Sequence, residues 1–495
     1  MTHGLGDAPP ARAAHDRTEL LVVAATVAAT AIAAACILLP TRLPFQDLMA
    51  RAAFSDAVGA AIAGTDPLLC ANPWPVHGWL YELVAWPLGL LLGPVGAERL
   101  LLAVSVAAIP AALARLLGAV GLPRAGAALC APFLLSVPVV MAYVPFMASM
   151  PLCLLTLASL SGRPSWRTAA LFLATYGLHA FGFVVAALCG GVAALVGRGW
   201  RAAVRVALLS APAAALTVVT SLTGEAARGL SWREGPLTRL GLALGRVVDV
   251  MASSVDTDLA TVAVLVSLGA AVLSIGRRTS TAWRGHAVGS AVVLGLALAL
   301  PEHVAAPPIF QLAERFLLPV ALLLPVALGV SLDGWRRRLL LIPPIGALLA
   351  GSLLLASLVS WGAKPAPVER LLARVPAGAV LLNAVSYASD PRSPVARTLV
   401  ANDAFRFQAE RRGAVIGQYG HPHMPVRWRE PVASSAGSTP ARFVERTAPL
   451  ADWVLTDAPP GHIPEQGVGW SLEPVAEDGD LRLLRVARHA PTEPQ

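Results

Sequence analysis

Long apolar runs separated by short polar connectors fill the chain from residue 20 to residue 361. Most of these runs approach the length of about 20 residues that a helix needs to cross a bilayer. The pattern predicts an α-helical polytopic membrane protein with about eleven transmembrane helices. The predicted spans are residues 20–39, 79–95, 100–120, 125–140, 144–160, 168–196, 206–222, 259–275, 287–300, 310–330 and 339–360.

The charged connectors predict the orientation of these spans. Residues 1–19 carry Arg12 and Arg17 ahead of the first run, which predicts a cytoplasmic N-terminal tail by the positive-inside rule. If the spans alternate, the Arg-rich connectors after residues 196, 275 and 330 also lie inside. The connectors that contain Arg124 and Arg167 fall on the opposite side. The sequence therefore leaves two topologies for the proline-rich stretch 125–160: two spans, or one re-entrant or broken segment.

The chain becomes polar and Pro-rich after Trp361. Strand-like and helix-like pieces alternate over residues 366–495 and predict a small C-terminal α/β domain, extracytoplasmic if the number of spans is odd. Two long connectors, residues 40–78 and 223–258, are predicted on the same outer face. Within the first, residues 47–62 predict an amphipathic helix that lies on the membrane surface.

Composition narrows the class of protein further. Hydrophobic residues make up 56% of the chain, charged residues only 14%, and the mean hydropathy is +0.64, which excludes a water-soluble enzyme. The net charge of +8 comes from basic residues in connectors between apolar runs, so it reflects membrane topology and predicts no nucleic-acid partner. The five cysteines lie mostly inside apolar runs, contain no CxxC pair and predict neither disulfides nor a metal site.

Asp47 is the first candidate for chemistry. It lies a few residues beyond the outer end of the first predicted span, where the predicted surface helix begins. A carboxylate in that position can take a proton from an acceptor hydroxyl or bind a divalent cation. The alternative is that Asp47 caps the helix, since Asp is a preferred N-cap residue.

A second group of candidates lies at the outer ends of the ninth and tenth predicted spans. Glu302 and His303 follow the ninth span, and Gln311, Glu314 and Arg315 share one face at the start of the tenth. A guanidinium in this position suits a phosphate or pyrophosphate group, which arginine can bind through two hydrogen bonds. The alternative is an ion pair between Glu314 and Arg315 that only holds the helix end.

Four other residues are weaker candidates. His179 shares a face of the sixth predicted span with Tyr176, and its alternative role is hydrogen-bonded packing. His77 lies near two tryptophans, and its alternative role is in an aromatic belt at the membrane interface. Asp256 and Asp258 form a DxD pattern, which binds metal in many sugar transferases but is common by chance. No P-loop, GxSxG, HExxH or Rossmann glycine pattern occurs in a suitable context, so ATP hydrolysis and nucleotide reduction have no support.

Several short motifs coincide with the predicted spans and loops. They are Gln46-Asp47 after the first span, Asn72-Pro73-Trp74 before the second, Ala97-Glu98-Arg99 before the third, Tyr176-Gly177-Leu178-His179 in the sixth and Arg315 in the tenth. With these motifs and the outer α/β region, roughly residues 20 to 490 resemble polytopic GT-C-type glycosyltransferase-like proteins of bacteria. The resemblance implies a GT-C-like helical fold in the bacterial cytoplasmic membrane.

The resemblance also implies a reaction and a set of roles. GT-C enzymes use a polyprenyl-phosphate-linked sugar as donor, and their acidic residue in the first outer loop corresponds here to Asp47, as base or metal ligand. Arg315 corresponds to the group that binds the donor phosphate. This chain departs from the better-known pattern because no second acidic residue adjoins Asp47. The candidate cavity-wall residues are His77, His179, Glu302, His303 and Glu314, and the candidate ligands of a divalent cation are Asp47, Asp256 and Asp258.

A second class of function remains open. A non-enzymic polytopic protein, such as a lipid-linked saccharide flippase or transporter or a scaffold for envelope assembly, has the same hydropathy pattern. Transporters commonly show internal repeats with paired broken helices at the membrane midplane. The proline-rich stretch 125–160 has no counterpart in the second half of the sequence, which disfavours a transporter.

Overall fold

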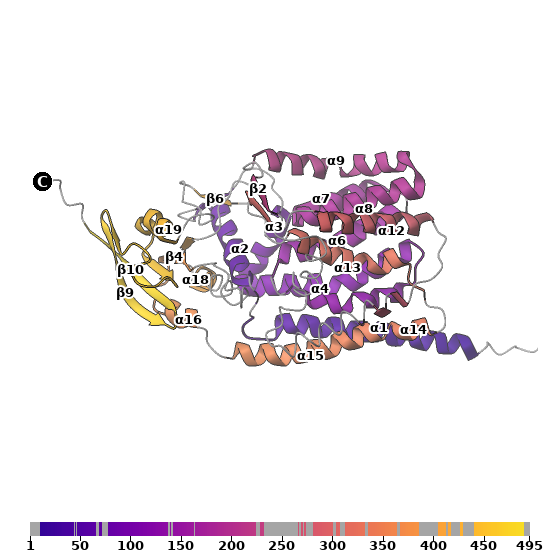
Figure 1. Ribbon diagram of the computed structural model, residues 1–495, viewed down its shortest axis with the longest axis horizontal. Helices are drawn as coiled ribbons and strands as arrows, with labels where there is room; N and C mark the ends of the chain where they lie inside the picture. The colour runs from indigo at the N-terminus through magenta and orange to yellow at the C-terminus, as the bar shows by residue number, and fades with distance from the viewer. Residues whose placement is uncertain are drawn as a thin grey trace, which may run out of the picture.

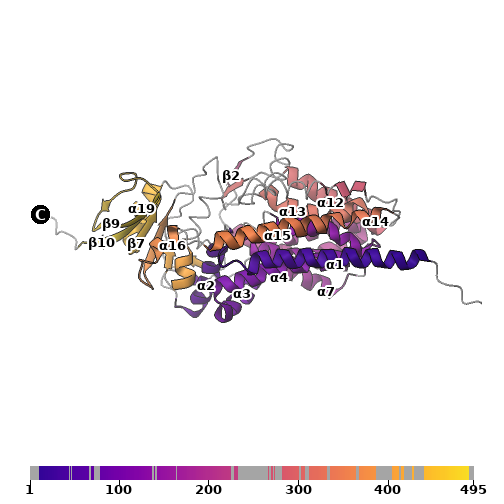
Figure 2. The same cartoon turned by 90° about the horizontal axis from the view of Figure 1, so that it is seen from below.

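Long helices form a bundle, and a small sheet region lies beyond one end of it (Figures 1 and 2). The N-terminal end of the first helix lies at the opposite end of the bundle (Figures 1 and 2). This computed structural model describes residues 10–43, 45, 47–65, 69–71, 78–136, 139, 142–162, 164–223, 228–231, 266, 269–270, 272–273, 281–299, 303–306, 312–331, 335–363, 367–385, 404–411, 414–416, 426–428 and 440–489.

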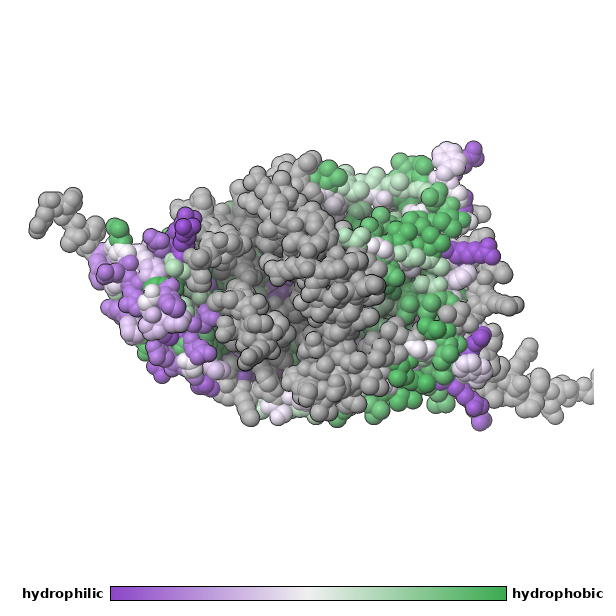
Figure 3. Space-filling view, viewed as in Figure 1, coloured by the Kyte–Doolittle hydropathy of each residue, from purple (hydrophilic) through white to green (hydrophobic). Residues whose placement is uncertain are grey.

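Six helices among the described residues are long and apolar enough to cross a membrane. The protein is therefore a multi-pass membrane protein, and Figure 3 shows a hydrophobic band over the bundle between two hydrophilic ends. The predicted number of about eleven spans remains untested. The six candidate spans lie in α1 (Pro10–Leu38), α4 (Pro94–Ala119), α6 (Val144–Ser161), α8 (Ala180–Arg198), α9 (Trp200–Thr223) and α14 with α15 (Arg336–Leu339 and Ile342–Gly362).

Other elements complete the described part of the bundle. They are α2 (Leu48–Ala63), α3 (Trp79–Leu92), the 3-10 helix η1 (Arg124–Leu135), α7 (Trp166–Leu178), α12 (Thr281–Ala299), α13 (Leu312–Leu328) and the strand pair β2 (Arg228–Ser231) and β3 (His303–Ala306). Two of them correct the sequence prediction. The run 168–196 is not one span but the two helices α7 and α8, and the chain is extended at His179 between them.

The other correction concerns α3, which was predicted to be the second span. Tyr81 in its first turn donates a hydrogen bond to Glu98, near the start of α4. Arg99 in turn donates to the carbonyl oxygens of Ile37 (2.8 Å) and Leu38 (3.0 Å) at the end of α1. The first turn of α3 thus lies beside the start of α4. The last residue of α3, Leu92, also lies there, because α4 begins two residues later at Pro94. Both ends of α3 are therefore at the same end of the bundle. The prediction that residues 79–95 cross the membrane is therefore wrong.

This arrangement removes the conflict over the arginines. Without a crossing at α3, α4 runs back toward the N-terminal end of α1, and Arg124 follows it there. One apolar cluster joins this end of the bundle and contains Val22, Ala125, Val330 and Leu340. Arg198 donates to the carbonyl oxygens of Leu160 (2.5 Å) and Gly162 (2.8 Å), which lie just before Arg167. The connectors that carry Arg124, Arg167, Arg198 and Arg336 thus share one end.

The C-terminal sheet has the strand order β5-β4-β7-β10-β9-β8. The first three strands are parallel to one another, and the last three join by antiparallel pairing. Leu381 and Leu483 face the cluster shared with the bundle, whereas their neighbours Leu382 and Leu484 face a second core with α19. The elements are α16 (Pro367–Leu372), β4 (Val380–Ala384), α18 (Arg406–Arg411), β5 (Ala414–Ile416), α19 (Pro440–Thr447), η2 (Ala448–Leu450), β7 (Trp453–Thr456), β8 (Gln466–Gly467), β9 (Trp470–Asp478) and β10 (Leu481–Arg488).

The sheet region is tied to the connector that follows α1. Strand β1 (Leu69–Ala71) of this connector pairs with β6 (Val426–Trp428) of the C-terminal region. The side chain of Gln408 in α18 donates to the carbonyl oxygen of Ala53 in α2 at 3.2 Å. Glu369 in α16 forms ion pairs with Arg42 (2.7 Å) and Arg406 (3.2 Å). Contacts from three places therefore hold the sheet region against α2 and the chain on either side of it.

Helix α2 forms where the sequence predicted it, but it does not lie on the membrane surface. Most of its side chains are buried, and the buried side chains lie on every face of the helix. Its many alanines and Gly59 let other helices approach closely; a Cβ at Gly59 would lie 2.1 Å from the ring nitrogen of Trp86 in α3. The helix packs on α3, α4 and α18. The predicted interfacial helix is thus a core element whose polar face points inward.

A close contact between α8 and α12 gives a test of the bundle packing. A Cβ at Gly289 would lie 2.6 Å from the carbonyl oxygen of Cys189, a backbone atom that cannot rotate away. We expect Gly289→Ala to destabilise the protein by about 1–3 kcal/mol, as overpacking commonly does. Gly295→Ala on the same helix is the matched control, because no atom lies within 4 Å of its added Cβ. Thermal unfolding of both variants measures the difference, and equal stability would contradict the close packing.

A surface ion pair between α16 and the end of β9 gives a test by pH. Arg370 donates to Asp478 through Nε (2.6 Å) and Nη2 (2.9 Å), and these hydrogen bonds lower the pKa of Asp478 below its usual value. The pair therefore stabilises the fold at neutral pH, and this contribution is lost as the pH falls through the lowered pKa. We expect Asp478→Asn to unfold at a lower temperature than the wild type at neutral pH, with the gap closing in acid. A gap independent of pH would contradict this.

Candidate functional site

Asp47 lies at the N-cap position of α2, at the end of the bundle that carries the sheet region. Its carbonyl oxygen accepts a hydrogen bond from the backbone N–H of Arg51 (2.7 Å), which begins the helix. Its side chain forms no capping hydrogen bond to α2. Asp47 therefore has the position of a helix cap, but its carboxylate does not form the capping hydrogen bond that this alternative requires.

The structure describes some of the other predicted residues and not others. His303 lies in β3, and Glu314 and Arg315 lie in the first turn of α13; the structure describes only their place in these elements. Helix α13 ends near Val330, at the N-terminal end of the bundle, so Arg315 at its start belongs to the same end as Asp47. Five predicted residues lie outside the described part: His77, Asp256, Asp258, Glu302 and Gln311.

His179 lies at the break between α7 and α8. Its Nδ1 accepts a hydrogen bond from the backbone N–H of Phe181 (3.2 Å), and its ring stacks on that of Phe181 at 5.4 Å between centroids. The ring of Phe146 meets it edge-on at 5.5 Å. These contacts show a histidine that caps α8 and packs against aromatic rings, as in the alternative that the sequence left open.

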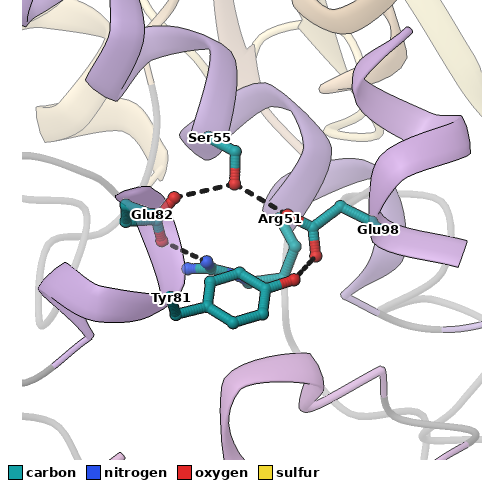
Figure 4. Close-up of polar contacts among 5 residues, drawn as sticks. All are labelled: Arg51, Ser55, Tyr81, Glu82 and Glu98. Atoms are coloured by element: carbon teal, nitrogen blue, oxygen red, sulfur yellow. Dashed lines mark hydrogen bonds and ion pairs between the residues drawn. The ribbon is translucent and has the colours of Figure 1, made fainter. Parts of the chain in front are cut away.

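The main polar feature near Asp47 is a buried network that the sequence reasoning missed. Arg51 and Ser55 in α2 meet Tyr81 and Glu82 in α3 and Glu98 in α4 (Figure 4). Arg51 forms an ion pair with Glu82, and the Ser55 hydroxyl lies 2.8 Å from Glu82 and 2.7 Å from Glu98. Tyr81 donates to the other oxygen of Glu98. Glu82 and Glu98 are only 2% and 0% exposed, so this network is part of the core.

The sequence did carry a signal for this network. Glu82 lies in a predicted span and Glu98 at the edge of the next, and an ionisable residue in an apolar run needs a partner because its insertion costs about 2.5–3.5 kcal/mol. Arg51 and Ser55 are one turn apart in α2, and Asp47 precedes Arg51 by another turn. The polar face of α2 thus runs from Asp47 into the network.

Comparison with known proteins gives one finding. No family model matches this chain. No curated protein matches its sequence either. Among solved structures, the chain is similar to the mycobacterial arabinofuranosyltransferase AftD, with a TM-score of 0.49 and 15% sequence identity. The match covers 95% of this chain and 40% of that one, so this chain spans less than half the length of AftD.

Electrostatics keep Arg51 charged in its buried position. Burial acts to lower the pKa of its guanidinium, but the negative charges of Glu82 and Glu98 outweigh this effect and hold the pKa above the usual value. The guanidinium also lies 4.9 Å from the ring centroid of Phe54 and 5.2 Å from that of Tyr81, both favourable cation–π distances. Arg51 is therefore a permanent positive charge that joins α2 to α3.

The described residues hold no evident cluster of ligands for a metal ion. They contain no group of three or more His, Cys, Asp or Glu side chains placed to bind a metal ion. Around the start of α2, the residue one turn from Asp47 is a cation, Arg51, and the two buried glutamates are engaged with Arg51, Ser55 and Tyr81. These described side chains do not fit a divalent cation, so we derive no step through one.

Proposed function

We propose that this protein is an integral membrane glycosyltransferase that transfers a sugar from a polyprenyl-phosphate-linked donor to an envelope acceptor. The observation that carries this proposal is the place of Asp47. This carboxylate begins a helix that is buried at one end of an apolar bundle, next to a polar sheet region. A lipid-linked donor reaches such a position from the bilayer, and a polar acceptor reaches it from water.

The proposed chemistry assigns each step to a side chain. The carboxylate of Asp47 takes the proton of the acceptor hydroxyl, whose oxygen forms a bond to the anomeric carbon of the sugar. The bond between that carbon and the phosphate oxygen breaks at the same time, and the lipid phosphate leaves with the electron pair. Arg315, at the same end of the bundle, binds the phosphate and stabilises its charge. The sheet region binds the acceptor.

The arginines support the proposed orientation. Described connectors with Arg124, Arg167, Arg198 and Arg336 gather at the end of the bundle opposite the sheet region, and positive residues favour the cytoplasmic side. The proposed arrangement has the N-terminus in the cytoplasm and Asp47 with the sheet region outside. The proposed location is the cytoplasmic membrane of a bacterium.

Turnover in a defined lipid system tests the proposal. The full chain is purified, reconstituted in lipid vesicles and supplied with a panel of radiolabelled polyprenyl-phosphate sugars and short saccharide acceptors. We expect transfer from at least one donor, absent from vesicles without protein. If no donor is used while the labelled lipid crosses the bilayer, the flippase alternative is supported instead. If neither transfer nor crossing occurs, a scaffold becomes the better explanation.

A further inference from the structure

The hydroxyl of Ser55 lies between two carboxyl groups in the buried network. Its oxygen is 2.8 Å from Oε2 of Glu82 and 2.7 Å from Oε1 of Glu98, and both distances are those of hydrogen bonds. A serine hydroxyl carries a single hydrogen, so it can donate to only one of the two carboxyl groups. The second hydrogen bond therefore needs a hydrogen from a carboxyl group, with Ser55 as the acceptor (Figure 4).

The ion pair decides which carboxyl group holds this hydrogen. Arg51 is paired with Glu82, which is therefore the ionised partner. Among the described residues, the hydrogen bonds of Glu98 are with two hydroxyl groups, those of Ser55 and Tyr81. Tyr81 donates to Oε2 of Glu98, which leaves Oε1 to carry the hydrogen that Ser55 accepts. The hydrogen bonds then run in one direction, from Glu98 to Ser55 and from Ser55 to Glu82.

The charge balance leads to the same assignment. Among the described residues, the titratable groups that act on Glu98 are Arg51 on α2 and Tyr81 and Glu82 on α3. With both glutamates ionised and one arginine, the network has a net negative charge at a site where the carboxyl groups are 0–2% exposed. Burial of an unpaired charge is costly, and a carboxyl group in that position takes up a proton instead. With Glu98 neutral, the network has no net charge.

We propose that Glu98 is a carboxylic acid that keeps its proton at neutral pH, and that this proton completes the hydrogen-bonded chain joining α2, α3 and α4. Glu98 does not contact Asp47 in this arrangement. It acts through Ser55, which is two turns beyond Asp47 on the same helix, and so fixes the start of α2. The inference rests on the hydrogen bonds and not on the proposed glycosyltransferase activity.

Infrared spectroscopy tests this assignment directly, because a protonated carboxyl group has a carbonyl stretching band separate from that of a carboxylate. The full-length protein in lipid vesicles is measured from neutral to mildly alkaline pH, where exposed carboxyl groups are ionised. We expect the wild type to show a protonated-carboxyl band that persists over this range and that is lost in Glu98→Gln. Tyr81→Phe shifts the band without removing it, because the carbonyl oxygen of Glu98 loses one donor. Asp56→Asn on α2 leaves the band unchanged.

Stability provides a second measurement. The amide of Glu98→Gln donates to Ser55 and accepts from Tyr81, as the neutral acid does, so this variant is expected to unfold at nearly the wild-type temperature. Glu98→Ala removes both hydrogen bonds and unfolds at a lower temperature. Absence of the persistent band from the wild type, or its survival in Glu98→Gln, would overturn the proposal. A Glu98→Gln variant as unstable as Glu98→Ala would also overturn it, because it would mean that the ionised form is required.

Discussion

Asp47→Asn is expected to lower sugar transfer by about 10²- to 10⁴-fold, the usual contribution of a positioned general base. Asparagine has nearly the same shape and still suits an N-cap position, but its amide cannot take a proton from the acceptor hydroxyl. The fold of α2 is expected to survive, because the carboxylate of Asp47 makes no capping hydrogen bond to this helix. The measurement is the initial rate of transfer from the active donor, for the wild type and the variant in the same vesicles.

The control for this variant is Asp56→Asn. Asp56 lies on the same helix and undergoes the same change of charge, but it begins no helix and belongs to no part of the buried network. We expect it to retain most of the transfer activity. Both variants are also compared with the wild type by thermal unfolding, so that a loss of activity is separated from a loss of folded protein. Near-normal transfer by folded Asp47→Asn would refute the assignment of the base.

Glu82→Ala is expected to destabilise the protein by about 3–5 kcal/mol, the range observed when one partner of a buried ion pair is removed. Arg51 would then retain its charge in the core without its paired carboxylate, since its side chain is held between Phe54 and Tyr81. The change also removes one acceptor of the Ser55 hydroxyl. The free energy of unfolding is measured by denaturant titration of the purified protein in mild detergent.

A double variant shows whether the loss comes from the unpaired charge. Replacing both partners by apolar residues of similar size, in Arg51→Met with Glu82→Leu, removes the buried charges together and is expected to recover a large part of the stability. The two single variants and the double variant form a cycle that isolates the pairwise energy. Additive losses would indicate that Arg51 and Glu82 do not depend on each other, in conflict with the ion pair.

The membrane bundle could be predicted from the sequence because membrane insertion depends on local hydropathy. A long apolar run is visible in the sequence, whatever its neighbours are. Hydropathy cannot show a break inside such a run, however. His179 interrupts residues 168–196 without a proline, since its ring nitrogen accepts a hydrogen bond from Phe181 and starts a new helix. Both halves are apolar, so the run looked like one long span.

The candidate site, too, could be predicted from the sequence only where it depends on local features. Asp47 could be singled out because its place after the first apolar run is a local feature. The buried network could not, because Arg51 and Glu82 are 31 residues apart and Ser55 and Glu98 are 43 apart. Only the packing of α2 on α3 and α4 brings them together. The same packing turned the polar face of α2 inward, where the sequence predicted a helix on the membrane surface.

The sequence by itself determined the class of this protein: a multi-pass helical membrane protein with a C-terminal region that contains strands. Those features follow from apolar length and from alternation between neighbouring positions, which are properties of short segments. The tertiary structure decided that α3 does not cross the bundle and that the arginine-bearing connectors share one end. It also decided that two buried glutamates share one serine and that, of these two, Glu82 alone forms an ion pair with Arg51. Long-range packing and the need to pair buried charges govern these features, and neither is encoded in any single segment.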